Sequence, residues 1–263
     1  MEKQLNFTDM EYSNRRRSTK REEFLKKMDR ILPWKQWVAA IEPYYPQGKH
    51  SRPPQGIEVM LRMLLVQVWF NLSDEAVEDA ILDSYAMKSF LGLDYAADEQ
   101  VPDATTLCKF RKLLNEHALQ KAIFDEVQNL LEKEGKQVRG GSIVDATIIE
   151  APKLLREDDE VVYGDAGYCK LERYVTDGVE RRYEINRQHG TFRRHSGDSL
   201  SWQKERVMEN RKSSVRCKVE YAFHIVKDIL HWRKVRYRGI CKNLNYVYIA
   251  FASANLYMLS CVA

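Results

Sequence analysis

The pattern of apolar residues changes near residue 138, and this change constrains the fold more than any other feature of the sequence. Before it, apolar residues recur at helical spacing in segments separated by short turns. After it come short runs rich in Ile, Val and Thr, at residues 142–149 and 161–164, a composition that favours strands. The sequence therefore predicts an α+β protein, with an all-helical domain over residues 1–135 and a mixed α/β domain over residues 136–263.

The helical domain contains one segment that is apolar on nearly all sides, residues 57–71. Such a helix belongs at the centre of a core. The other helices are amphipathic or begin with a good cap, such as Ser73 before an acidic first turn. We predict helices at about 22–32, 34–41, 57–71, 74–91, 106–115 and 119–134.

In the second domain, residues 175–186 alternate weakly around Asp177-Gly178, which predicts a hairpin. A long helical region begins near residue 199. Residues 246–263 carry no charge and are mostly apolar. A membrane anchor is one interpretation, since a span needs roughly 17–25 apolar residues. Because polar residues such as Ser253 and Asn255 interrupt the segment, we favour a buried closing helix.

Composition excludes several classes of protein. The five cysteines form no CxxC pair, so neither a zinc site nor a disulfide framework is indicated, and a reducing cytoplasm is expected. The N-terminus lacks the apolar core of a signal peptide. A formal net charge of +4 over 263 residues is mild, so local clusters of basic residues are better evidence for a nucleic-acid partner than the whole-chain charge.

Three acids stand out from their surroundings. Asp145 lies in an apolar strand, Asp165 directly follows another, and Glu220 lies in a helical run. A carboxylate in an apolar strand is costly to bury unless it is paired or binds a metal. Mg²⁺ prefers carboxylate ligands and keeps some of its waters. These acids are therefore candidate metal ligands, although strand-end acids and a surface glutamate with structural roles remain an alternative.

Basic residues gather in two places. Residues 211–242 carry ten lysines and arginines and only two acids, Glu220 and Asp228. The second cluster, residues 15–21, is either a solvated arm or an arm that contacts phosphates. Trp232 and Tyr237 lie among the first group, where they either stack on unpaired bases or pack in the core. Residues 59–115 also show the pattern of short helices and short turns that is typical of a helix–turn–helix, which is a weak signal by itself.

Several longer motifs resemble bacterial insertion-sequence transposases of the DDE type, insertion-sequence-five group. They are Thr8-Asp-Met-Glu-Tyr-Ser-Asn-Arg-Arg-Arg, Ile31-Leu-Pro-Trp, Ile41-Glu-Pro-Tyr-Tyr-Pro, Asn71-Leu-Ser-Asp, Val144-Asp-Ala-Thr-Ile-Ile-Glu-Ala-Pro, Gly164-Asp-Ala-Gly-Tyr and Val219-Glu-Tyr-Ala-Phe-His-Ile-Val-Lys. The resemblance implies an N-terminal DNA-binding domain and a ribonuclease-H-like catalytic domain. It also implies Mg²⁺, for which Mn²⁺ can substitute, in cutting element ends and joining them to target DNA.

The resemblance assigns roles by position. Asp145, Asp165 and Glu220 become the catalytic, metal-binding triad. The family signature around the glutamate is matched by Arg216, Glu220 and Lys227, whereas Ser213 stands where the family has tyrosine. The expected DNA-contacting residues are Arg15, Arg16, Arg17, Lys20, Arg21, Arg216, Lys227, Arg233, Lys234 and Arg236.

The chain departs from the family between the two aspartates. Only residues 146–164 separate them, where the family fold has two strands and a helix, so we infer an internal deletion near Lys153-Leu154. Adjacent parallel strands need a crossover of about a dozen residues or more. Residues 150–160 come close to that length, so the two aspartates can still meet in a shortened domain whose Asp145 strand is left at an open edge.

Two functions follow from the resemblance. The first is a transposase catalysing Mg²⁺-dependent strand cleavage and strand transfer at insertion-sequence ends. The second is a non-catalytic protein that binds element ends and represses transposition. A nuclease without strand transfer is a third alternative. The expected partners are double-stranded DNA, at terminal inverted repeats and at the target, and further copies of the chain, with no membrane partner. The expected location is the nucleoid of the bacterial cytoplasm.

Overall fold

The computed structural model describes residues 15, 17–46, 48, 53–93, 100–134, 141–144, 160–164, 166, 178–187, 200–232, 234–235 and 237–262. Of these, 141–144, 200–201, 216, 218–220 and 262 are described by their backbone alone. The chain divides into two compact units. Unit 1 comprises Met1–Gly135 together with Ile225–Ala263, and unit 2 comprises Lys136–His224.

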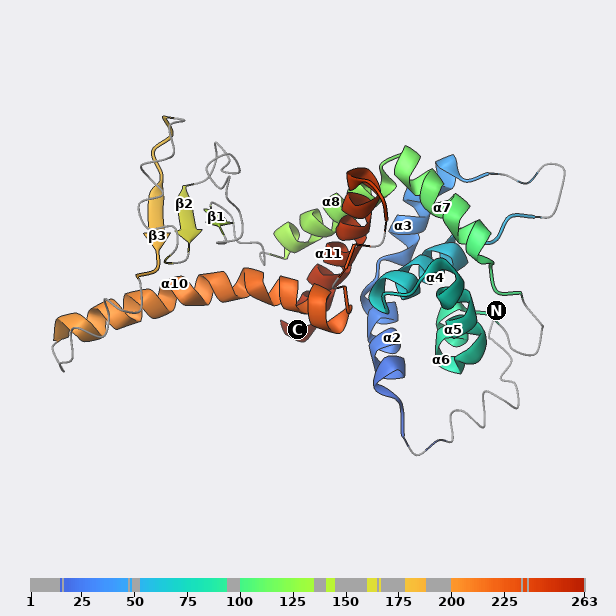
Figure 1. Ribbon diagram of the computed structural model, residues 1–263, viewed down its shortest axis with the longest axis horizontal. Coiled ribbons are helices and arrows are strands. Elements are labelled where there is room, and N and C mark those ends of the chain that lie inside the picture. Colours follow the sequence, from blue (N-terminus) through green and yellow to red (C-terminus); the bar gives the residue numbers. More distant parts are fainter. Residues whose placement is uncertain are drawn as a thin grey trace. The chain divides into compact units, whose positions relative to one another are not determined.

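Unit 1 is helical in the part of it that the structure describes (Figure 1). Its elements in chain order are α2 (Lys20–Ile31), α3 (Trp34–Ile41), the 3-10 helix η1 (Glu42–Tyr44), α4 (Ile57–Trp69), α5 (Asp74–Asp83), α6 (Tyr85–Leu91), α7 (Ala104–Glu116), α8 (Leu119–Lys133), the π-helical turn η5 (Ile225–Ile229) and α11 (Ile240–Val262). The helices predicted from periodicity are thus confirmed, with one exception between α5 and α6.

That exception is the helix predicted over residues 74–91, which is two helices. Ser73 caps α5 as expected, because its hydroxyl oxygen accepts a hydrogen bond from the Ala76 N–H at 3.1 Å. Ser84 then adopts an extended backbone, and its hydroxyl accepts from the Met87 N–H at 3.4 Å. A serine side chain that bonds nearby backbone in this way ends one helix and starts the next.

The core of unit 1 is built around α4, as its all-round apolar sequence predicts. Helices α3, α5, α6, α7 and α11 all pack against it. Its fully buried side chains include Met60, Leu61, Met63, Leu65, Val66 and Trp69, each 0 % exposed. Close packing of this kind fixes the positions of the surrounding helices.

The C-terminal helix α11 belongs to the same core. It packs against α8, α4 and α2, and Figure 1 shows it beside α8. The Tyr246 hydroxyl donates to the Val68 carbonyl at 3.0 Å, and the Asn245 amide donates to Asn115 Oδ1 at 2.8 Å. Residues 225–263 therefore group with the N-terminal helices in unit 1.

The predicted closing helix, residues 246–263, is the larger part of α11. Its buried side chains, Ile249, Ala250, Ala252, Ala254 and Leu256, complete the apolar cluster of unit 1. Among the described residues, no helix is both long enough and apolar enough to cross a membrane.

Unit 2 contains a small parallel sheet and one long helix. The strands β1 (Gly141–Val144), β2 (Val161–Gly164) and β3 (Arg182–Ile185) lie in the order β1-β2-β3, and both neighbouring pairs are parallel. Helix α10 (Leu200–His224) packs against β2. In Figure 1 the arrowheads of β2 and β3 point toward α10, so the carboxyl edge of the sheet faces this helix.

Of the hairpin predicted around Asp177-Gly178, the structure describes only the part from Gly178 onward. That part contains β3, which pairs in parallel with β2 through an Arg182 N–H bond to the Glu160 carbonyl at 2.9 Å. A parallel neighbour needs a crossover rather than a tight turn. The first arm, residues 175–177, lies outside the described residues.

Candidate active site

At the carboxyl edge of the sheet, β1 and β2 end at the residues that directly precede two of the predicted acids. β1 ends at Val144 and β2 ends at Gly164, and these two residues are paired with each other. Asp145 and Asp165 are therefore the next residues of two adjacent strands, whose spacing is about 4.7–4.9 Å. Both aspartates lie outside the described residues.

The third strand extends this edge. The Asn186 N–H donates to the Gly164 carbonyl at 3.0 Å, so pairing continues to the residue before Asp165. Val162, in the middle of β2, is 0 % exposed and anchors the strand in the interior of unit 2. The edge beside Asp165 is therefore held from both the sheet and the interior.

Polar side chains of α10 hold the end of β3. The Lys212 ammonium donates to the Ile185 carbonyl and to Glu209 Oε1, both at 3.1 Å. Glu209 Oε2 accepts from the Arg187 N–H at 3.0 Å and from the Asn186 side-chain amide at 3.1 Å. We call this group the α10–β3 network; its members are Asn186, Arg187, Glu209, Lys212 and Ser213.

Charge is balanced within the network. Lys212 and Glu209 are 17 % and 15 % exposed, and Lys212 also lies 3.7 Å from Glu184 Oε2. Burial opposes the charged form of Glu209, but the hydrogen bonds from Arg187, Lys212 and Asn186 outweigh it and lower the pKa of its carboxyl. Glu209 is thus held as a carboxylate that accepts hydrogen bonds both from the end of β3 and from Lys212 on α10.

Ser213 lies on the same face of α10 as the predicted catalytic glutamate. Its hydroxyl accepts from Asn186 Nδ2 at 3.2 Å, so the residue that replaces the tyrosine of the family signature contacts the end of β3. Arg216 and Glu220 follow three and seven residues later. Positions three, four and seven apart share one face of a helix. Arg216 and Glu220 therefore occupy the stripe of α10 that carries the network, although their side chains are not described.

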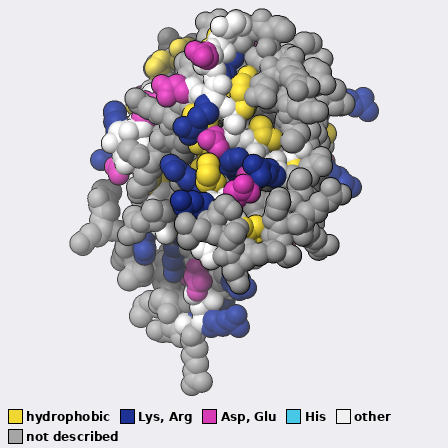
Figure 2. All heavy atoms as spheres, turned by 90° about the vertical axis from the view of Figure 1, so that its left-hand side faces the viewer, with side chains coloured by type: hydrophobic (Ala, Val, Ile, Leu, Met, Phe, Trp, Pro, Cys, Tyr) yellow, Lys and Arg dark blue, Asp and Glu magenta, His cyan; other side chains and the backbone are white. Residues whose placement is uncertain are grey.

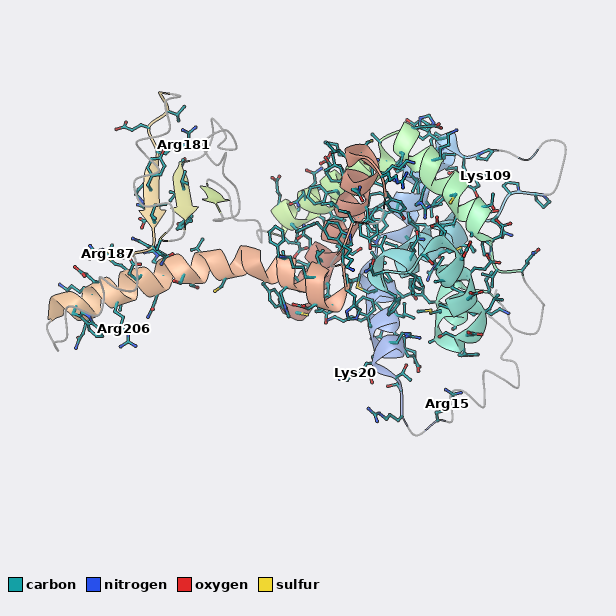
Figure 3. All side chains as sticks on the ribbon, in the orientation of Figure 1. Arg15, Lys20, Lys109, Arg181, Arg187 and Arg206 are labelled. Carbon is teal, nitrogen blue, oxygen red and sulfur yellow. The ribbon has the colours of Figure 1, made fainter. Side chains whose placement is uncertain are left out.

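Acidic and basic side chains alternate on the outer part of this unit. Figure 2 shows them side by side on the face that carries the first half of α10. One such pair is Arg187 with Glu205, at 3.1 Å. In Figure 3, Arg187 lies beside α10 at the end of β3. Since these charges compensate one another, this face offers no broad patch of positive charge among its described residues.

The predicted basic arm is only partly described. Arg15, Arg17 and Lys20 are exposed, and Figure 3 shows Arg15 and Lys20 at the beginning of α2. The Arg21 guanidinium lies over the Phe70 ring, 5.4 Å from its centroid. Arg21 thus anchors the end of the arm to the core of unit 1. Arg16 lies outside the described residues.

The other predicted DNA-contacting residues divide between the units. Lys227 and Lys234 belong to unit 1, and both are exposed. Arg233 and Arg236 lie outside the described residues. Arg216 belongs to unit 2 and is described by its backbone alone.

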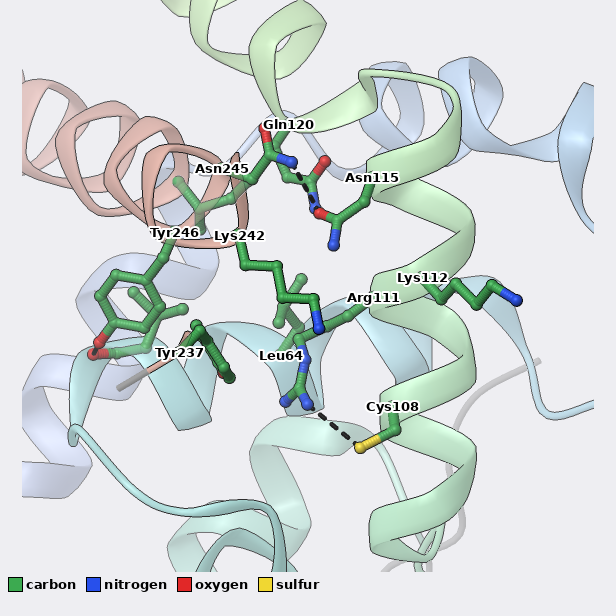
Figure 4. A pocket seen from close by; sticks show the side chains of 12 residues that line it. Leu64, Cys108, Arg111, Lys112, Asn115, Gln120, Tyr237, Lys242, Asn245 and Tyr246 are labelled. Carbon is green, nitrogen blue, oxygen red and sulfur yellow. Dashed lines mark hydrogen bonds between the residues drawn. The ribbon is translucent and has the colours of Figure 1, made fainter. Parts of the chain in front are cut away.

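Unit 1 also contains a hollow of about 380 Å³ among α7, α8, α11 and α4 (Figure 4). Arg111 enters it and binds the Asp74 carboxylate, with Nη2 2.8 Å from Oδ2, while its guanidinium lies 5.0 Å from the Tyr237 ring centroid. The hydrogen bond from Arg111 outweighs burial and lowers the pKa of Asp74 to about 2. The described lining of the hollow contains no carboxylate, which makes it unsuitable as an acidic metal site.

Sequence reasoning missed both polar arrangements. The α10–β3 network had a detectable signal, because Glu209, Ser213, Arg216 and Glu220 recur at one helical face. The Arg111–Asp74 pair joins residues far apart in the chain, so no local pattern predicts it.

Two family models match the chain. Residues 13–113 match the family described as Transposase domain (DUF772), and residues 135–256 match the family described as Transposase DDE domain. The first match lies within unit 1. The second covers unit 2, continues into α11 and includes all three predicted acids. No solved structure matches the chain.

Proposed function

The chain is a DDE transposase, an enzyme of DNA transposition, and we propose that it cuts and joins DNA at insertion-sequence ends through a site formed by Asp145, Asp165 and Glu220. Its domain pair matches the insertion-sequence transposases. Within them we assign it to the insertion-sequence-five group on the motifs of its sequence. It acts at the terminal inverted repeats and at target DNA in the bacterial nucleoid.

One observation carries the assignment of the site. The residues that precede Asp145 and Asp165 are paired across adjacent parallel strands. Two acids far apart on the folded chain would not form one metal site, whereas acids at paired strand ends can. We place Glu220 with them because it shares a helical stripe with the α10–β3 network, which binds the same edge of the sheet.

DDE transposase domains work with divalent metal ions, and we propose Mg²⁺, held by these three carboxylates, with Mn²⁺ able to replace it. When bound, such an ion neutralises charge on the scissile phosphate and lowers the pKa of bound water. The chain itself positions the reacting groups. We assign Arg216 and Lys227 to the phosphates around the cut and the basic arm at residues 15–21 to the flanking DNA.

We infer that unit 2 is a shortened ribonuclease-H-like domain. The family fold has further strands between the two aspartates, whereas this chain has only residues 146–164. A deletion near Lys153-Leu154 accounts for the difference. It removes strands from the far side of β1, which is the edge strand of the described sheet. We further propose that copies of the chain assemble on paired ends.

The short connection between the aspartates favours a second candidate function. A chain whose metal site is weakened by the deletion would still bind element ends through its DNA-binding regions. It would then compete with intact transposases and repress them. The two candidate functions differ in whether the protein cleaves DNA, and both require that it bind DNA.

The test is cleavage of a duplex that carries the DNA flanking this gene, with Mg²⁺ or Mn²⁺, by the wild-type and Asp145→Asn proteins. We expect nicking at a defined end that requires metal and is lost in the variant, with DNA binding retained. Specific binding without nicking by the wild type would favour the repressor. Loss of binding together with cleavage in the variant would reject the role of Asp145.

A further inference from the structure

A second hollow in unit 1 lies beside Trp232, at the turn that follows η5. Its volume is about 430 Å³, and its described lining comprises Lys227, Asp228, Trp232, Lys234 and Val235. This volume is within the range of about 300–1,000 Å³ that is usual for small-ligand sites. An indole between two lysines offers a flat apolar surface next to positive charge.

The backbone around Trp232 is fixed by unit 1. Its N–H donates to the Val226 carbonyl at 3.0 Å, and Val226 is 1 % exposed. The preceding residue, His231, has a φ of 52°, and its carbonyl accepts from Asn71 Nδ2 at 2.8 Å. A left-handed residue held by a side chain of another element indicates a turn with a defined shape.

The indole packs beside the ring of Tyr246. Its ring centroid lies 5.6 Å from that of Tyr246, and the two planes are inclined by 33°. Tyr246 is fixed in turn by its bond to the Val68 carbonyl. Trp232 remains partly exposed and lines the hollow. A partly exposed indole on a rigid support is preorganised for stacking, because binding costs it little side-chain freedom.

Of the three charged residues in the described lining, two are lysines and one is Asp228, so positive charge prevails beside the indole. Lys227 and Lys234 are both exposed, and ammonium groups bind phosphate. Every base has a π face, so an aromatic platform beside cations binds unpaired bases with little regard to sequence. Lys227 also stands seven residues after Glu220 in the chain.

We propose that this hollow binds one unpaired nucleotide of the transposon-end DNA, with its base stacked on Trp232 and its phosphate on Lys227 and Lys234. The proposal rests on the proposed function, because it requires that the chain bind end DNA. It adds a contact that double-stranded DNA cannot make, since a paired base is not available for stacking. The chain therefore binds an end with an unpaired overhang more tightly than a blunt end.

The experiment uses two probes with the DNA sequence that flanks this gene, one blunt and one with a short single-stranded overhang. Affinity is measured for the wild type, Trp232→Ala, Trp232→Phe and the matched control Tyr44→Ala, which removes another exposed ring of unit 1 that is 47 % exposed. We expect Trp232→Ala to weaken overhang binding about tenfold, as base–aromatic stacking implies, and to leave blunt binding unchanged. Trp232→Phe retains most of the preference, and Tyr44→Ala retains all of it.

An equal loss on both probes, or no loss on either, would overturn the proposal. A second measurement uses the wild-type protein, with 2-aminopurine as the first unpaired base of the overhang. Stacking on the indole quenches its fluorescence, and the absence of quenching contradicts the proposal even if Trp232→Ala fails to fold. Failure of the wild type to bind either probe would instead reject DNA-end binding, and with it the proposed function.

Discussion

Unit 1 and unit 2 use different forces to hold their elements in place. In unit 1 a continuous apolar cluster joins helices from both ends of the chain, and α4 is buried on nearly all sides. In unit 2, Val162 is the only fully buried apolar side chain among the described residues, whereas hydrogen bonds and ion pairs join α10 to β3. The helical unit therefore has a stable core of its own.

The difference explains how each unit can serve a transposase. A rigid helical unit keeps a DNA-contacting surface in place without help from the ligand. In the described part of unit 2, polar contacts join α10 to β3, and a unit held in this way gains further stability from whatever binds its folded form. We therefore expect metal and DNA to stabilise unit 2 more than unit 1.

The largest expected effect comes from removing apolar volume in unit 1. Ile249→Ala removes a side chain that is 2 % exposed, and Ile240→Ala makes the same change in the same helix where the side chain is 87 % exposed. We expect the first to lower the free energy of unfolding of unit 1 by about 2–5 kcal/mol and the second to change it by less than about 0.5 kcal/mol.

Hydrogen–deuterium exchange read by mass spectrometry measures this effect in each unit separately. Faster exchange in Ile249→Ala that is confined to unit 1 would support the contrast between the two units. Similar destabilisation by the two variants would mean that α11 is not part of the core.

An intermediate effect is expected in the α10–β3 network. Lys212→Met keeps the apolar stem but removes the ammonium, so Glu209 and Glu184 lose their shared cation. We expect unit 2 to lose about 1–3 kcal/mol, as for a partly buried group left without its partner. Because Glu220 shares this face of α10, metal-dependent cleavage should fall as well.

The measurement is exchange in unit 2 together with single-turnover cleavage. Lys204→Met provides the control, because Lys204 is an exposed residue of the same helix. If Lys212→Met and Lys204→Met behave alike, the network does not position α10.

The smallest expected effect is a pH dependence in unit 1. The pKa of Asp74 is lowered to about 2 by its bond to Arg111, so its contribution is fully present above the unfolded pKa, near 4. That contribution is lost as pH falls from about 4 toward 2. Asp74→Asn should remove this part of the acid dependence, so that the variant is less stable than the wild type above about pH 4 and the difference shrinks as pH falls toward 2.

Chemical denaturation of both proteins at a series of pH values between 2 and 7 measures the effect. The account is contradicted if the stability difference between wild type and variant stays constant over that range.

Most helices of unit 1 could be predicted from the sequence because their signals are local. Residues 57–71 predict α4 almost to its observed ends, Ile57–Trp69. The break at Ser84 is not predictable from the sequence, because a serine is often tolerated within a helix. Only the extended backbone of Ser84 in the structure shows that one helix ends there and the next begins. The apolar character of residues 246–263 predicted burial of α11 but not the helices against which it packs.

The site was predictable to the extent that its residues follow strands. Asp145 and Asp165 were singled out because each carries charge at an apolar strand, and the parallel pairing of β1 with β2 agrees with their meeting. The place of β3 in the sheet, beside β2 and parallel to it, was not predictable, because Asp177-Gly178 predicts a hairpin instead. Contacts such as Lys212 with Ile185 depend on that place, and no pattern within α10 alone reveals them.

The central claim is that Asp145 and Asp165 share one metal site despite the short connection between them. Its most direct test is Mn²⁺ binding, measured by electron paramagnetic resonance, in the wild type, Asp145→Asn and Asp165→Asn, with Mg²⁺ as competitor. We predict that each single variant weakens binding at the same Mn²⁺ site and that Mg²⁺ displaces the ion from the wild type. Wild-type-like Mn²⁺ binding in both variants would contradict the account.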